Sequence, residues 1–246
     1  MTRNLIVRIA IAGVLLGSRA ATSGEPHWRY SGAQGPDHWT DLSPKNAACV
    51  GKNQSPIDLT GFIEADLAPL ALSYSAGGSE VVNNGHTVQV DYAKGSTLTV
   101  DGIPFELIQF HFHAPSENLI EGKSFPLEAH FVHANKDGDL AVVALLFTEG
   151  VDNPGLAEIW SVMPKKEGER NRLSPPFAAD RLLPSDRDYY RYSGSLTTPP
   201  CTEGVRWVVL KQSVTASRAQ IDAFSRVLHE HNNRPVQPIH GRPVLQ

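Results

Sequence analysis

The chain has 246 residues, of which 41% are hydrophobic and 20% charged, and its formal net charge is −4. This composition is typical of a folded globular protein and excludes a disordered chain. The absence of a basic excess argues against a nucleic-acid partner. The apolar run at residues 9–16 has eight residues, whereas a membrane helix requires about 20, so we expect no stable membrane span in the mature chain.

The N-terminus has the order of a secretory signal. Arg3 precedes the short apolar run, Arg8 lies directly before it, and small residues follow at Ser18 and Ala20. This order predicts a signal peptide over residues 1–20, with residues 21–246 left as one mature domain, and an exported protein that is periplasmic or secreted. The alternative is a buried N-terminal strand, because Arg8 interrupts the apolar stretch.

Cys49 and Cys201 are the only two cysteines. An even number in an exported chain favours a disulfide between them. Closing so long a loop would remove roughly 4–5 kcal/mol of unfolded-state entropy. If the chain is not exported, two free buried thiols become the better interpretation.

Strand patterns outnumber helix patterns along the chain. We expect helices at residues 156–163 and 218–230, the second with a capping box formed by Ser217 and Gln220. The predicted fold is mixed but β-dominated: a single domain around a large central, mostly antiparallel and twisted sheet with a few short peripheral helices. The expected strands cover residues 88–92, 96–100, 105–113, 127–134, 140–147 and 205–211.

Histidines on two of these strands indicate a metal site. Successive side chains of a strand alternate faces, so His111 and His113 point the same way. If the next strand lies alongside, His130 approaches this pair. Three imidazoles suit zinc, and a three-ligand site keeps the fourth tetrahedral position for water.

Two further side chains share these faces. Gln109 and Glu128 carry oxygens that can accept the outward N–H of a ligand histidine. The His-x-His pattern alone is a weak signal, and structural or surface histidines are the alternative.

At this point the residues resemble the α-class carbonic anhydrases, and most of all the exported bacterial members. The resemblance covers nearly the whole mature chain in the right order. It rests on QFHFH at 109–113, SEN at 116–118, LEAHFVH at 127–133 and SGSLTTPP at 193–200, and it extends to HWRY at 27–30, NQSPIDL at 53–59, NNGH at 83–86, NNRPVQP at 232–238 and Arg242.

The resemblance implies reversible hydration of carbon dioxide to bicarbonate and a proton by attack of zinc-bound hydroxide. It implies Zn²⁺ on His111, His113 and His130. Thr197 matches the threonine that accepts a hydrogen bond from the hydroxide and donates to Glu117. An ionised carboxylate only accepts, which forces the threonine hydroxyl to donate to it. Thr198 matches the threonine that contacts bicarbonate.

The resemblance also assigns the rest of the pocket. An apolar wall for carbon dioxide is matched by Val132, Val142, Leu196, Val205 and Trp207, although ordinary core packing is the alternative for most of them. His86 matches the proton shuttle, since histidine titrates near neutral pH; the alternative is a loop histidine without a role. The water network is matched by Tyr30, Asn84 and Gln89. Pairing of Cys49 with Cys201 would brace the threonine loop.

Three other functions compete with this one. A zinc-dependent esterase would use the same nucleophile on an ester. A non-catalytic carbonic-anhydrase-like binding module typically lacks a ligand histidine, and all three are present here. A zinc carrier would show a histidine-rich tract, whereas the ten histidines are dispersed. The expected partners are the small molecules carbon dioxide, bicarbonate and water, and a homodimer is left open.

Overall fold

A computed structural model describes residues 27–246, so the predicted signal peptide at 1–20 lies outside the described residues. The helices are α1 (Trp39–Leu42), α2 (Pro154–Ser161) and α3 (Arg218–Leu228), with the short 3₁₀ helices η1 (Gly32–Gln34), η2 (Pro36–His38), η3 (Pro44–Val50) and η4 (Ala179–Leu182). The strands are β1 (Asp58–Leu59), β2 (Ala71–Ser73), β3 (Ala76–Asn83), β4 (Val88–Tyr92), β5 (Thr97–Val100), β6 (Ile103–His113), β7 (Leu119–Ile120), β8 (Leu127–Ala134), β9 (Leu140–Glu149), β10 (Arg170–Ala178), β11 (Tyr189–Ser195), β12 (Glu203–Leu210) and β13 (Val214–Ala216).

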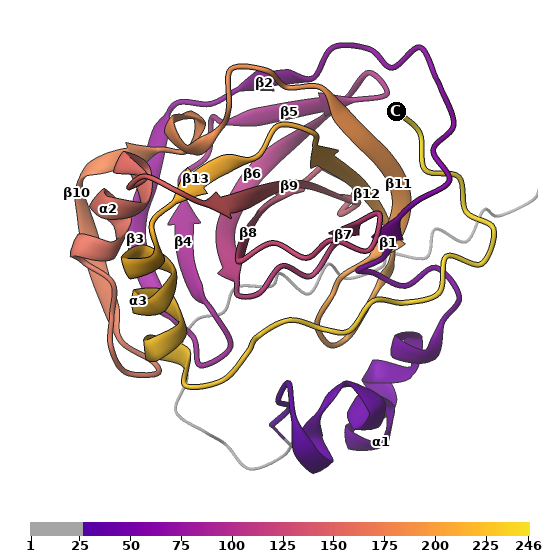
Figure 1. Ribbon diagram of the computed structural model, residues 1–246, viewed down its shortest axis with the longest axis horizontal. Coiled ribbons are helices and arrows are strands. Elements are labelled where there is room, and N and C mark those ends of the chain that lie inside the picture. The colour runs from indigo at the N-terminus through magenta and orange to yellow at the C-terminus, as the bar shows by residue number, and fades with distance from the viewer. Residues whose placement is uncertain (1–26) are drawn as a thin grey trace, which may run out of the picture.

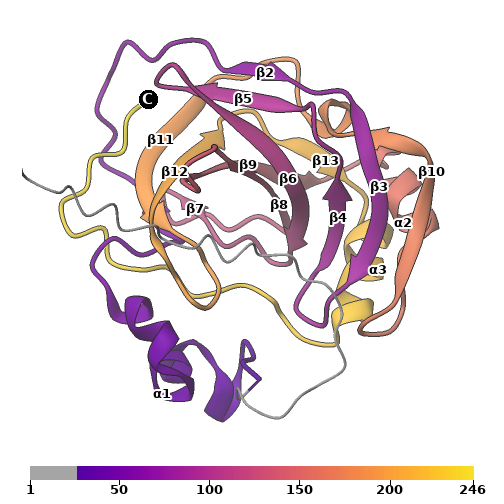
Figure 2. The ribbon, with the colours of Figure 1, turned by 180° about the vertical axis from the view of Figure 1, so that it is seen from behind.

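A curved sheet of 11 strands forms the centre of the molecule, with the main order β10-β3-β4-β6-β8-β9-β12-β11 (Figures 1 and 2). Most neighbours are antiparallel, and β9 is joined in parallel by β12 and β13. The predicted β-dominated, mostly antiparallel fold with few helices is confirmed. Among the described residues, no helix combines the length and the apolar character needed to cross a bilayer.

The two faces of the sheet carry different side chains because paired residues of neighbouring strands share a face. Phe110 of β6 pairs with Phe131 of β8, and both belong to the larger hydrophobic core, which also includes residues of α2 and α3. His111 pairs with His130 one position further along, so these rings lie on the opposite face. A smaller core covers part of that face and contains Val142 and Trp207.

The local signals at the helix ends explain the boundaries. The Ser217 hydroxyl accepts from the N–H of Gln220, and the Gln220 side chain accepts from the N–H of Ser217, so the predicted capping box is present. Helix α3 ends at Leu228, two residues earlier than expected, where His229 adopts φ = 64°. Helix α2 begins before residue 156 because the Asn153 side chain caps it.

Five strands of the sheet were not expected from the sequence: β2, β3, β10, β11 and β13. Strand β3 contains Gly77 and Gly78, and β10 at the sheet edge contains Pro175 and Pro176, residues that are unfavourable inside strands. Strand β11 carries mostly polar residues. Strands β3, β10 and β11 widen the sheet at its two ends and leave the central pair β6–β8 as predicted.

Candidate metal centre and active site

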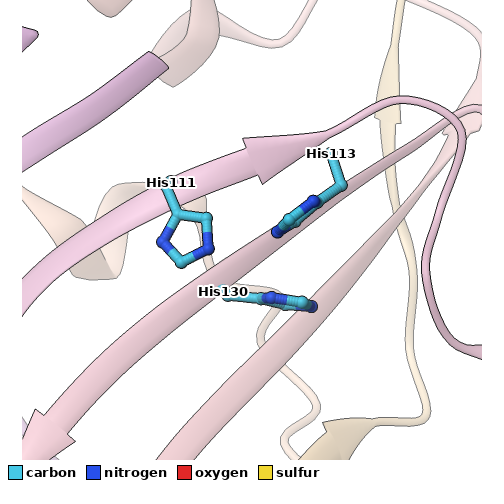
Figure 3. Close-up of side chains that lie close together, drawn as sticks. All are labelled: His111, His113 and His130. Carbon is cyan, nitrogen blue, oxygen red and sulfur yellow. The ribbon is translucent and has the colours of Figure 1, made fainter. Parts of the chain in front are cut away.

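The three predicted ligand histidines converge from two neighbouring strands. Figure 3 shows His111 and His113 projecting from β6 and His130 from β8, with their rings turned toward a common point. One nitrogen of each ring lies within 4.8 Å of the corresponding atoms of the other two. The ring centroids are 4.6 to 5.4 Å apart. The alternation of strand faces and the β6–β8 register produce this cluster.

One nitrogen of each ring is held by a neighbouring acceptor. Nδ1 of His111 lies 2.9 Å from Oε1 of Gln109, and Nε2 of His130 lies 2.9 Å from Oε1 of Glu128. Nδ1 of His113 lies 2.7 Å from the main-chain oxygen of Asn232. Because these oxygens can only accept, each ring donates its N–H to them and keeps a lone pair on its other nitrogen.

The free nitrogens fit a metal. Nε2 of His113 is buried and has no hydrogen-bond partner within residues 27–246, which is costly unless a cation binds it. Burial lowers the pKa of His111 and His130 well below the usual range, and each is lowered further by neighbouring histidines. Burial also lowers the pKa of His113. The cluster has no fourth ligand among the described residues, and three neutral imidazoles match the donor set of a catalytic zinc site.

Glu117 lies directly behind the histidines and is buried. Its Oε1 accepts from the N–H of Arg234 at 2.8 Å and lies 3.6 Å from Nδ1 of His113, while its Oε2 lies 3.8 Å from Nδ1 of His130. Burial raises the pKa of Glu117 well above its usual value, whereas the Arg234 N–H and the Thr197 hydroxyl lower it. Among the described residues, Oε2 of Glu117 has no hydrogen-bond partner.

Glu128 is the second buried carboxylate of the site. Its Oε2 accepts from the N–H groups of Glu117 and Asn118 at 2.7 and 2.9 Å, and its Oε1 accepts from Nδ2 of Asn118 at 2.6 Å. Burial raises the pKa of Glu128, and the Asn118 side chain is the strongest opposing influence. These donors hold the carboxylate in position against His130.

The loop that carries Thr197 and Thr198 is anchored at both ends. The main-chain oxygen of Thr198 accepts from the N–H of Cys201 at 2.8 Å. Cys201 is bonded to Cys49 across 152 residues, which confirms the predicted disulfide. Thr197 is buried, and Thr198 is partly exposed.

The five expected apolar wall residues gather in the smaller core. Val132 pairs with Val142 across β8 and β9, and Val142 pairs with Trp207 across β9 and β12, so these three share the face of His130. The Trp207 ring lies edge-on to His130, with centroids 4.9 Å apart. Val205 belongs to the same core, and Leu196 packs against it.

His86 lies against aromatic rings at residues 27–28. Its ring stacks on Trp28 with centroids 3.7 Å apart, and His27 lies 4.7 Å away. Burial lowers the pKa of His86 to about 4, and the charges of His27 and Arg29 add to the effect. In this position His86 does not titrate near neutral pH, contrary to the value expected from an unperturbed histidine.

The three residues matched to the water network have different surroundings. Burial raises the pKa of Tyr30 well above its usual value, and the charge of Glu117 contributes. The Asn84 side chain accepts from the N–H groups of His86 and Thr87 at 3.0 and 2.9 Å. Gln89 pairs with His111 on β6, but its amide donates to Asp91 at 2.6 Å.

Two contributors to the site were missed from the sequence. Asn232 supplies the acceptor for His113, and its side chain bonds the main chain at His86, Phe112 and Ala114. Arg234 supplies the N–H that holds Glu117. The bonds to His113 and Glu117 come from main-chain atoms, which have no residue-type signature. Their only signal was the 232–238 segment within the family resemblance.

Comparison with known proteins agrees with this geometry. Residues 34–246 match the model of the eukaryotic-type carbonic anhydrase family. The chain is 51% identical to a carbonic anhydrase of Pectobacterium atrosepticum, covering 92% of this chain and 93% of the relative. It is 46% identical to one from Neisseria gonorrhoeae, covering 93% and 91%.

A solved structure gives the same result. The fold superposes on α-carbonic anhydrase from Thermovibrio ammonificans, solved with the inhibitor sulfanilamide, with a TM-score of 0.89 and 50% identity. The match covers 91% of this chain and all of that chain. The chain is therefore an enzyme of the eukaryotic-type, or α-class, carbonic anhydrase family.

Proposed function

We propose that the chain hydrates carbon dioxide reversibly to bicarbonate and a proton, using zinc held by His111, His113 and His130. The observation that carries this proposal is the convergence of three neutral imidazoles, one of which has a buried nitrogen without a partner. When bound, zinc supplies a nucleophile from water near neutral pH and favours the ionised form of Glu117.

Glu117 and Thr197 orient the attacking oxygen. The Thr197 hydroxyl donates a hydrogen bond to the Glu117 carboxylate, so the Thr197 oxygen must accept a hydrogen bond from the nucleophile. A lone pair of the attacking oxygen is thereby aimed at the substrate carbon. This role is supported by the burial of both side chains and by the Arg234 N–H that fixes Glu117.

Carbon dioxide is held beside the histidines by apolar contacts. It carries no charge and no hydrogen-bond donor, so an apolar wall suits it better than a polar one. Val132, Val142 and Trp207 lie on the sheet face of His130 and support this role, together with Leu196 and Val205. Thr198, which is partly exposed beside Thr197, contacts the bicarbonate product.

His86 transfers the product proton to solvent once it leaves its stack with Trp28. The stacked ring has a pKa of about 4 and binds a proton poorly at pH 7. Release into water restores a pKa near 6.5 and makes the ring an efficient proton acceptor. Asn84 bonds the main chain at His86, and Tyr30 and Gln89 complete the water path.

The protein works outside the cytoplasm, in the periplasm or after secretion. The Cys49–Cys201 disulfide supports an oxidising compartment. The basic, apolar and small residues of positions 1–20 support cleavage near Ala20 or Ala21. N-terminal sequencing of the exported protein tests this directly; a retained Met1 would contradict the cleavage.

Stopped-flow carbon dioxide hydration tests the activity. We expect rapid hydration by the zinc-loaded chain, loss after treatment with a chelator and recovery when zinc is returned. Thr197→Ala should keep its zinc and lose about 100-fold or more in kcat/KM. Hydration no faster than buffer, with one zinc per chain, would overturn the proposal. Faster turnover of an activated ester than of carbon dioxide would assign an esterase instead.

A further inference from the structure

Arg234 is a buried cation whose side chain has no role in the function proposed above. Its side chain is 2% exposed, and its guanidinium lies over the Trp39 ring, 5.3 Å from the centroid. Nη1 donates to Oε1 of Gln54 and to the oxygen of Ser55, both at 2.8 Å, and Nη2 donates to the oxygen of Cys49 at 2.9 Å. The guanidinium thus fastens the segment 49–55.

The segment held by Arg234 is bonded in turn to both ends of the threonine loop. Cys49 is joined to Cys201 by the disulfide, and Nε2 of Gln54 donates to the oxygen of Cys201 at 3.1 Å. At the other end, Ser55 and Ser195 exchange two hydrogen bonds of 2.9 and 3.1 Å between main-chain N–H groups and hydroxyls. Thr197 therefore lies between two attachments to residues that Arg234 binds.

The main chain of Arg234 binds Glu117, the proposed partner of Thr197 in orienting the attacking oxygen. Its N–H donates to Oε1 of Glu117 at 2.8 Å. The same residue therefore holds Glu117 directly and holds the Thr197 loop through segment 49–55. Arg234 is thus bonded to Glu117 through its main chain and to the segment that holds the Thr197 loop through its side chain.

We propose that Arg234 is a positioning residue that sets the alignment of Thr197 with Glu117. This inference rests on the proposed function, because it gives Arg234 a role in aligning Glu117 and Thr197, the two residues proposed to orient the attacking oxygen. Arginine suits the task since its planar fork satisfies three acceptors at once in a fixed geometry, which a lysine ammonium cannot reproduce.

The arrangement is costly for a residue that only stabilises the fold. Nε of Arg234 is buried without a partner, and burial lowers the pKa of Arg234 to about 10 despite the opposing charge of Glu117. The acceptors of the guanidinium are neutral oxygens, and burying a charge without a directly paired countercharge is costly. The cost is consistent with selection for alignment of the pair.

A double-mutant cycle tests the inference. Arg234→Gln should keep one zinc per chain and lose about 10- to 100-fold in kcat/KM for carbon dioxide, because a small misplacement of the pair slows the attack. Its effect should shrink to about 2-fold or less in a Thr197→Ala background, where no alignment remains to be lost. Arg234→Lys should recover part of the loss. Equal effects of Arg234→Gln in both backgrounds would overturn the inference.

Arg242 provides the matched control. Its guanidinium also binds main-chain oxygens, those of Gln54, Ser193, Pro238 and Ile239, but it contacts neither Glu117 nor Cys49. Arg242→Gln should lower the melting temperature and leave kcat/KM within about 2-fold. A loss equal to that of Arg234→Gln would show that any tether of this segment matters equally, which contradicts the proposal.

Gln54→Ala keeps the test valid if Arg234→Gln does not fold. It removes one acceptor of Arg234 and the donor to Cys201, so it should give the same non-additive pattern with Thr197→Ala. Additive losses would again overturn the inference. If the wild-type chain hydrates no carbon dioxide, the proposed function fails and the inference falls with it. If it does and the cycle is additive, only the inference fails.

Discussion

Trp28 and His86 stack almost face to face, with ring planes 8° from parallel and centroids 3.7 Å apart. The stack contributes to the burial that lowers the pKa of His86 to about 4. We expect Trp28→Ala to raise this pKa toward the unperturbed value near 6.5, because the ring becomes hydrated. An NMR titration of the His86 ring protons measures the change.

The control for this variant is Trp28→Phe, which keeps an aromatic surface under His86 and should keep most of the pKa shift. A His86 pKa that stays near 4 in Trp28→Ala would show that the charges of His27 and Arg29 cause the shift instead.

Loss of His86, the proposed proton-transfer group, should slow only one step. We expect His86→Ala to keep its zinc and its kcat/KM but to lose turnover in weak buffer, since proton transfer then limits kcat. Added imidazole should restore part of the rate. Unchanged turnover in weak buffer would assign proton transfer to another group.

The acceptor behind His111 should tune the affinity for the metal. Gln109→Ala removes the oxygen 2.9 Å from Nδ1 of His111, and loss of such a partner weakens zinc binding by about 10- to 100-fold. Competition with a chromogenic chelator measures the affinity. Gln89→Ala is the control, because Gln89 lies opposite His111 on β4 but bonds Asp91. Equal losses in both variants would contradict the role of Gln109.

Removal of a ligand should have a larger effect than removal of its acceptor. His111→Ala leaves two imidazoles at the centre, and we expect loss of most zinc and nearly all activity with the fold retained. Metal analysis with circular dichroism checks both. A His111→Ala chain that keeps one zinc and full activity would refute the ligand set.

His133 on the other face of the sheet should make stability depend on pH. It is fully buried, with Nε2 2.6 Å from the Tyr74 hydroxyl and Nδ1 3.3 Å from the oxygen of Ala141. Burial lowers the pKa of His133 to about 4. The unfolded chain binds a proton below about pH 6.5 and the folded chain only below about pH 4, so stability falls as the pH drops through this range.

Between pH 7.5 and pH 4, this one group should remove about 3 kcal/mol of unfolding free energy. Urea unfolding of the wild type and of His133→Gln at both pH values isolates the contribution, since all other histidines are common to the two chains. Equal pH dependence in the two chains would contradict the assignment.

The disulfide should contribute both stability and alignment. Replacing Cys49 and Cys201 by serine opens a loop of 152 residues, and we expect a loss of about 5 kcal/mol in the unfolding free energy. The chain should also lose part of its kcat/KM, because Thr197 lies close to Cys201. Denaturant unfolding and carbon dioxide hydration measure the two effects, and full activity of the serine variant would refute the bracing of the loop.

The central part of the fold could be predicted because its signals are local. Alternation along 109–113 and 127–133 placed the phenylalanines on one face and the ligand histidines on the other, as β6 and β8 show. The edge strand β10 could not be predicted in the same way, since its two prolines oppose strand structure and only pairing with β3 determines its conformation.

The contacts of the site that are made by side chains on the two strands could be predicted from the sequence. Gln109 and Glu128 precede His111 and His130 by two positions, so strand geometry alone puts them on the same face. The acceptor for His113 is a main-chain oxygen 119 positions away, and any residue type could supply it. The stacked position of His86 depends on packing against the N-terminal aromatic residues, which no local pattern specifies.

After α3, the C-terminal segment runs past one end of the sheet, with the strands on one side of it and α1 on the other (Figures 1 and 2). There Asn232 holds His113 and Arg234 holds Glu117. During synthesis, the ribosome adds these last anchors only after all three histidines and both threonines are complete. A nascent chain therefore contains every side chain of the proposed metal site before it can hold them rigidly, and tight zinc binding should coincide with the final stage of folding.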